Sequence, residues 1–336
     1  MLHRSIAEYL GYALAALLLA VGAALFYFGG FNYLLANDSS SFSVELALAQ
    51  SRAHRDATVV VLGNSTASED FRANQFNQRS PGKIAVNLGV PSAQMYLFDR
   101  LLSMSIERGL RPRIVVLFVT PEILSLRSDF DYLLNDLTML KTELSAADLA
   151  RLASHARDLP AYVNYASYVA ARPVLFRGEL RDFFTHPAWR LKAGAVTHAW
   201  LASFEPGSPM IETNNPFSVC DAGPLPALEQ TISRLRREGR PSEAGDVERV
   251  RAAYAARVHQ RLQVDRFEAV RFRRLLQRLA ARSQAVYVVP APYYDPDYDQ
   301  YPSDYRVAEE RAIREIAAGV SRVKLLPEFP ADCHLF

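Results

Sequence analysis

The chain has 336 residues, of which 50% are hydrophobic and 22% are charged, and its formal net charge is +2. This length is enough to bury a large core, in one large domain or in two smaller ones. The near-neutral charge gives no argument for a nucleic-acid partner. The two cysteines, Cys220 and Cys333, are too few for a disulfide scaffold or a cysteine-rich zinc protein.

The N-terminal segment is the most apolar part of the chain. Residues 9–35 contain no charged side chain, and this run exceeds the apolar region of a secretory signal, so it predicts a single transmembrane anchor. Arg4 precedes the run, which by the positive-inside rule places residues 1–8 in the cytoplasm. The rest of the chain is then expected outside the inner (cytoplasmic) membrane, in the periplasm. Residues 36–56 are predicted to be a polar tether with a short helix over 44–52.

Five short apolar runs, bounded by turn residues, follow the tether. They lie at residues 58–62, 84–87, 113–119, 285–289 and 323–326. Helical patterns separate them, at residues 92–109 and 306–318 among others. Runs of this length that alternate with helices predict an α/β fold with a parallel, doubly wound sheet.

The alternation stops in the middle of the chain. Residues 57–123 and 284–336 are therefore predicted to form the α/β domain, and residues 124–283 a large helical insertion or cap. The insertion includes a basic stretch that is expected to be one long helix from Asp246 to Arg282, with its arginines on a solvated face.

Side chains that can carry out chemistry follow several of the predicted strands. Ser65 follows the first strand, Asn87 and Gly89 the second, and Asp332 and His334 the last. Ser65 could be an ordinary helix cap. Acyl transfer, however, needs a hydroxyl nucleophile, a base that activates it, a group that orients the base and N–H donors for the oxyanion. All four can be supplied from one edge of a parallel sheet.

Three short blocks resemble a known family. Gly63–Asn64–Ser65, Asn87–Leu88–Gly89 and Asp332–Cys333–His334–Leu335 are similar to blocks of the SGNH (GDSL-like) hydrolase superfamily. With the predicted anchor, the Asp-x-His ending resembles more narrowly the extracytoplasmic O-acyltransferases of alginate acetylation, and more distantly the teichoic-acid D-alanylation protein. Thr120–Pro121–Glu122 stands where the superfamily has an oxyanion-donating asparagine.

The resemblance implies a three-layer α/β/α domain and a set of roles. Ser65 would be the nucleophile, His334 the base and Asp332 the group that orients His334. Ser65, Gly89 and Asn87 would form the oxyanion hole. The implied function is O-acyl transfer, with acetyl expected, to an exported or cell-surface polysaccharide. The implied partner is a multi-pass membrane O-acyltransferase that delivers the acyl group.

Other readings stay open. The same residues suit an esterase that removes acyl groups from glycans, and the chain could also be an inactive scaffold of a polysaccharide-export complex. Tyr293, Tyr294 and Tyr298 follow the fourth strand and could stack on sugar rings or simply pack within their loop. No metal or other cofactor is expected, because the histidines show no paired ligand spacing.

Overall fold

A computed structural model of the protein describes residues 2–25, 39–124, 131–192, 225–257, 264–290 and 303–327. The chain divides into two units. The first unit comprises residues 1–45 and 137–204, and the second unit comprises residues 46–136 and 205–336.

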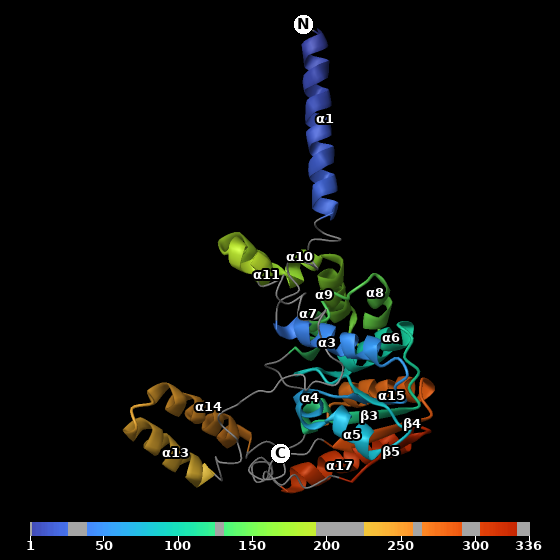
Figure 1. The fold of residues 1–336 in the computed structure, drawn as a ribbon, viewed down its shortest axis with the longest axis vertical. Coiled ribbons are helices and arrows are strands. Elements are labelled where there is room, and N and C mark those ends of the chain that lie inside the picture. Colours follow the sequence, from blue (N-terminus) through green and yellow to red (C-terminus); the bar gives the residue numbers. More distant parts are fainter. Residues whose placement is uncertain are drawn as a thin grey trace. The chain divides into compact units, whose positions relative to one another are not determined.

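The second unit is built on one parallel sheet of five strands in the order β2-β1-β3-β4-β5. Figure 1 labels its strands β3, β4 and β5. The strands are β1 (Val59–Leu62), β2 (Ala85–Asn87), β3 (Ile114–Val119), β4 (Ala285–Pro290) and β5 (Val323–Leu325). They coincide with the five apolar runs of the sequence, which are rich in β-branched residues. The predicted α/β fold with a parallel sheet is confirmed.

Helices connect successive strands of this sheet. The connecting elements are α4 (Ser65–Asp70), α5 (Ala73–Arg79), α6 (Met95–Glu107), η2 (Pro121–Leu124), α15 (Arg266–Ala281) and α17 (Ser303–Ala318). Parallel strands are almost always joined by right-handed crossovers. With this strand order, that rule puts α6, α15 and α17 on one face of the sheet and α4 and α5 on the other. The contacts agree, because α15 packs against both α6 and α17.

The two faces of the sheet are covered to different extents at β3. Val115, Leu117 and Val119 are almost fully buried, whereas the residues between them are half-buried. A strand as uniformly apolar as β3 is typical of burial on both faces. The half-buried Phe118 lies near Phe71, the residue after α4, with ring centroids 6.5 Å apart. The half-buried residues of β3 therefore face α4 and α5, and the buried ones face α6 and α15.

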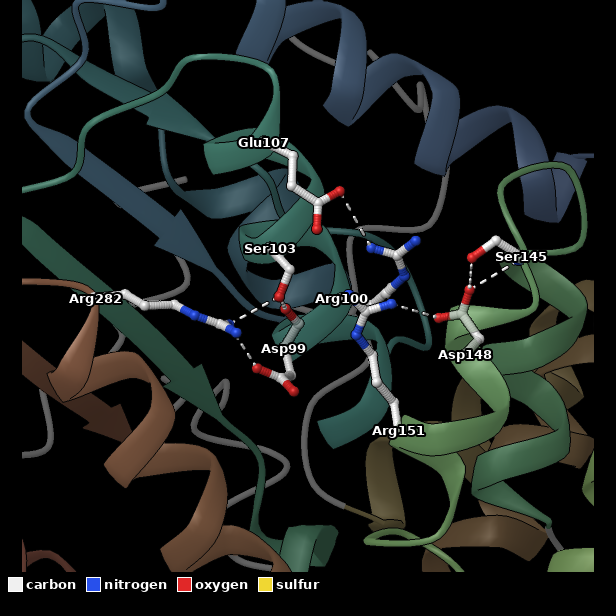
Figure 2. Close-up of polar contacts among 8 residues, drawn as sticks. All are labelled: Asp99, Arg100, Ser103, Glu107, Ser145, Asp148, Arg151 and Arg282. Atoms are coloured by element: carbon white, nitrogen blue, oxygen red, sulfur yellow. Dashed lines mark hydrogen bonds and ion pairs between the residues drawn. The ribbon is translucent and has the colours of Figure 1, made fainter.

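A buried acidic side chain fixes α15 to α6 across this face (Figure 2). Asp99 of α6 accepts a hydrogen bond from Arg282, and its second oxygen lies 3.0 Å from Nε of Arg278. Arg282 also donates to the hydroxyl of Ser103. Burial lowers the pKa of Arg278, while the Asp99 carboxylate counteracts that shift. Arg278 was expected on a solvated face, and it instead binds helix to helix.

The long helix predicted from Asp246 to Arg282 is wrong, because the structure has two helices there. The helix α14 (Pro241–Arg257) packs on α13 (Leu225–Arg237), and α15 begins separately at Arg266. Asp265 caps α15 by accepting hydrogen bonds from the N–H groups of Phe267 and Glu268. Because α15 packs on the sheet, it belongs with the α/β elements rather than with the predicted insertion of residues 124–283.

The first unit is helical in its described residues. Its helices are α1 (Leu2–Leu25), α8 (Ala147–Leu152), α9 (Leu159–Ala170), α10 (Arg172–Leu175) and α11 (Arg177–Thr185). A buried ion pair between Lys141 and Glu179 joins α11 to the residues that precede α8. Asp148 accepts hydrogen bonds from the backbone and the hydroxyl of Ser145 and thereby fixes the start of α8 (Figure 2).

The structure bears on two predictions for the N-terminal part of the chain, the tether and the membrane anchor. The short helix predicted over 44–52 is part of α3 (Ser39–Ala53). This helix buries Val44, Ala47 and Leu48 completely, so residues 39–53 are a packed helix and not a polar tether. The chain passes between the two units within α3 and again within α7 (Tyr132–Met139). No helix in the described ranges combines the length and the apolar character that a membrane crossing requires. The predicted anchor over 9–35 is thus not supported by the structure, and its residues 26–35 lie outside the described residues.

Candidate functional site

Ser65 is the first residue of α4, just beyond the carboxyl end of β1. The cap of this helix is Asn64, whose side-chain oxygen accepts a hydrogen bond of 3.2 Å from the N–H of Thr66. The alternative role of Ser65 as a helix cap is therefore wrong. The hydroxyl of Ser65 is half-buried, and none of the described residues forms a hydrogen bond with it.

The order of the strands also bears on where Ser65 lies in the sheet. The chain leaves β1 for β2 on one side, and it then returns past β1 to β3 on the other. The direction of winding reverses between β1 and β3, and in open α/β sheets ligands bind outside the carboxyl ends of the strands at such a switch point. Ser65 follows β1, and Thr120 follows β3. The sheet thus places Ser65 where this fold class forms its ligand site.

The loop after β2 is locked onto α4 by the side chain of Asn87. Its Nδ2 donates to the carbonyl oxygens of Ala67 (2.6 Å) and Phe71 (2.9 Å), and its Oδ1 accepts from the N–H of Gly89 (2.9 Å). Asn87 is 5% exposed. Because the amide satisfies three buried backbone groups, neither a carboxylate nor an apolar side chain could replace it without leaving groups unpaired.

Close packing explains the glycine at position 89. A Cβ atom there would lie 2.6 Å from the backbone nitrogen of Ser68 and 2.9 Å from the carbonyl carbon of Ala67. The N–H of Gly89 is used by Asn87. Asn87 and Gly89 were predicted as oxyanion donors, and in this arrangement their donors already bind within the protein. Their geometry favours a positioning role, in which they hold Ser65 and its turn in place.

Asp136 was not singled out from the sequence, but it organises the next loop. Its two carboxylate oxygens accept hydrogen bonds from the N–H groups of Gln94 (2.9 Å) and Leu97 (3.0 Å), at the start of α6. The neighbouring Asn135 donates to the carbonyl of Ser92, a residue with a positive φ of 63°. Asp136 comes from a segment some 40 positions away from the helix it caps. No local pattern could have revealed this cap.

The Asp136 carboxyl is fully buried, and burial raises its pKa to about 7. The backbone N–H groups and the positive charge of Arg271 act in the opposite direction. Arg271 itself is held by Glu268, so it is not a free counter-ion. The carboxyl that caps α6 therefore changes charge near neutral pH.

This shift predicts a pH dependence of stability. Between the unfolded pKa of 3.8 and the folded pKa of about 7, the folded chain binds one proton more than the unfolded chain. The free energy of unfolding should then fall as pH rises through this window, by at most about 1.4 kcal/mol per pH unit, and level off above it. Urea titrations of the wild type and of Asp136→Asn at pH 5 to 8 measure this, because the variant lacks the titration. A constant difference between the two proteins would contradict the assignment.

The remaining predicted site residues lie outside the described residues. These are Asp332, His334, Tyr293, Tyr294 and Tyr298. Their approach to Ser65 stays a prediction.

Comparisons of the chain with protein-family models, with curated proteins and with solved structures find no match.

Proposed function

We propose that the protein is an SGNH-like O-acyltransferase that transfers an acyl group, with acetyl expected, to a polysaccharide. The observation that carries the proposal is the Ser65 hydroxyl, which is half-buried, is not hydrogen-bonded by the described residues and lies at the switch point of a parallel sheet. A nucleophilic serine needs both a position at which substrate can bind and an oxygen that the fold does not already use.

The topology also allows the proposed base to reach Ser65. His334 follows the end of β5 by nine positions, and nine extended residues span up to about 30 Å. The strands β4 and β3 lie between β5 and β1, so the distance to cross is three strand spacings, about 14 Å. All five strands are parallel, so the chain leaves β5 at the same edge of the sheet that carries Ser65.

In the proposed reaction, Ser65 Oγ attacks the carbonyl carbon of the acyl donor while the imidazole of His334 takes the hydroxyl proton. Asp332 orients the imidazole. The bond to the donor's leaving group breaks, the leaving group receives the proton, and an acyl-serine remains. A sugar hydroxyl then attacks this ester and gives its proton to His334, which returns it to Ser65. The backbone N–H of Ser65 would donate to the oxyanion.

The proposal also covers the location of the enzyme in the cell and its partner. Residues 9–35 would anchor the chain in the cytoplasmic membrane, with residues 1–8 in the cytoplasm and the α/β unit in the periplasm. A multi-pass membrane O-acyltransferase would supply the acyl group. Tyr293, Tyr294 and Tyr298 would contact the sugar rings.

The test is an acyl-transfer assay with the full chain. The purified protein is incubated with p-nitrophenyl acetate and with neutral or uronic-acid oligosaccharides, and mass spectrometry compares acetylated sugar with free acetate. We expect acetyl transfer to exceed hydrolysis. Free acetate alone would identify an esterase. The absence of both products would contradict the proposal and favour the scaffold.

A further inference from the structure

The helix α11 and the residues that follow it belong to the first unit (Figure 1). Several large apolar side chains of this segment are exposed. Phe184 is 77% exposed, Trp189 is 60% exposed and Leu191 is 49% exposed. Single exposed apolar residues are common on protein surfaces, but a cluster of large ones within eight positions marks an interaction surface.

Backbone hydrogen bonds continue from α11 into the residues that follow it. The N–H of His186 donates to the carbonyl of Asp182, and the N–H of Arg190 donates to the carbonyl of His186. The guanidinium of Arg190 is buried and lies 3.9 Å from the carboxylate of Asp182. Arg190 is buried, whereas its neighbours Trp189 and Leu191 are exposed.

The charged side chains of this segment that lack an ion-pair partner among the described residues are all positive. Arg177, Arg181 and Lys192 are exposed, and none of them forms an ion pair with a described residue. The two acidic residues of the segment are neutralised, Glu179 by Lys141 and Asp182 by Arg190. Arg177, Arg181 and Phe184 are spaced four and three positions apart, which places them on one face of α11. We call this set the α11 surface: Arg177, Arg181, Phe184, Trp189, Leu191 and Lys192.

We infer that the α11 surface docks on the headgroup region of an anionic lipid bilayer. Exposed Trp, Phe and Leu that are flanked by unpaired Arg and Lys are the composition of segments that lie in a membrane interface. The cations would lie among anionic headgroups, and the aromatic rings would lie at the boundary with the acyl chains, where Trp is favoured.

The remainder of the first unit supports a bilayer over another protein as the occupant. The same unit contains α1, which exposes large apolar residues from Tyr9 to Val21. The core of a protein–protein interface, in contrast, is depleted in charged residues, although arginine is common across such interfaces. The inference concerns how the chain contacts a bilayer, and it does not depend on the proposed catalysis.

The test uses the fluorescence of Trp189 in the full chain. The chain has two tryptophans, so Trp200→Phe makes Trp189 the single reporter. This protein is mixed with vesicles of phosphatidylglycerol and phosphatidylcholine whose lipids carry bromine at the 6,7 or the 11,12 positions of the acyl chain. Flotation reports whether the chain is bound at all, by α1 or otherwise. We expect Trp189 to be quenched more strongly by the shallow bromines, and quenching to be weaker in pure phosphatidylcholine.

A charge variant and a matched control complete the test. Arg177→Gln, Arg181→Gln and Lys192→Gln together should reduce quenching of Trp189 several-fold in anionic vesicles. The control is Arg266→Gln, Arg311→Gln and Lys324→Gln, which removes three exposed cations of the second unit and should leave quenching unchanged. The inference is overturned if the chain floats while Trp189 stays unquenched, if it does not float, or if quenching is equal in neutral and anionic vesicles. The first of these results would point to a protein partner or a second copy at this surface.

Discussion

Replacing Ser65 by alanine should abolish acyl transfer while leaving the protein folded. The hydroxyl is the atom that would carry the acyl group, and loss of such a nucleophile typically reduces kcat by a factor of about 10⁴ or more. The change should not cost stability, because Ser65 is half-buried, its hydroxyl binds no described residue, and Asn64 caps the helix. The acetyl-transfer assay measures activity, and circular dichroism measures folding.

Ser68 provides the matched control for this substitution. It lies on the same short helix and its hydroxyl donates to the carbonyl of Ser65 at 2.9 Å. Ser68→Ala therefore removes a hydroxyl close to the site without removing the proposed nucleophile. We expect its activity to stay within a few-fold of the wild type. Equal activity in Ser65→Ala and Ser68→Ala would show that Ser65 does not carry the reaction.

Replacing Gly89 by alanine should destabilise the second unit strongly. The new Cβ would lie 2.6 Å from the backbone nitrogen of Ser68, and backbone atoms of α4 cannot move aside as the end of a flexible side chain can. Overpacking of this kind costs about 1–3 kcal/mol or more. The strain would also disturb the Asn87 hydrogen bonds beside it, so we expect the upper end of that range, measured by urea unfolding.

Gly245, within α14, is the comparison for Gly89. No atom lies within 4 Å of a Cβ placed there, and alanine is preferred over glycine inside a helix by about 1 kcal/mol. Gly245→Ala should therefore leave stability unchanged or raise it. If Gly89→Ala were as well tolerated as Gly245→Ala, the close approach between the loop after β2 and α4 would be wrong.

The sheet could be predicted because its strands are short and almost purely apolar. Val59–Leu62 and Ile114–Val119 contain no polar residue, and the Gly and Pro residues near the apolar runs mark where strands end. Helix boundaries were harder to predict. The break before α15 depends on the cap by Asp265, and the basic stretch on both sides of it is compatible with a continuous helix.

The candidate site could be predicted only in part, because its contacts join residues that are far apart in the sequence. Ser65, Asn87 and Gly89 could be singled out because each lies at or just beyond the carboxyl end of a strand. Their actual contacts depend on how two loops meet, and the sequence does not show that Asn87 binds the carbonyls of Ala67 and Phe71. The pairing of Asp99 with Arg282 joins residues 183 positions apart, and the cap of α6 by Asp136 is similarly non-local. Such interactions leave no local pattern.

The most direct test of the central claim is the rate at which a fluorophosphonate labels Ser65 in the full chain, with and without His334. The probe forms a bond only with a serine whose proton is removed by a nearby base. We predict one label per chain on the peptide that contains Ser65, and a rate at least about 100-fold lower in His334→Ala. Absence of label on Ser65, or an unchanged rate in His334→Ala, would contradict the account.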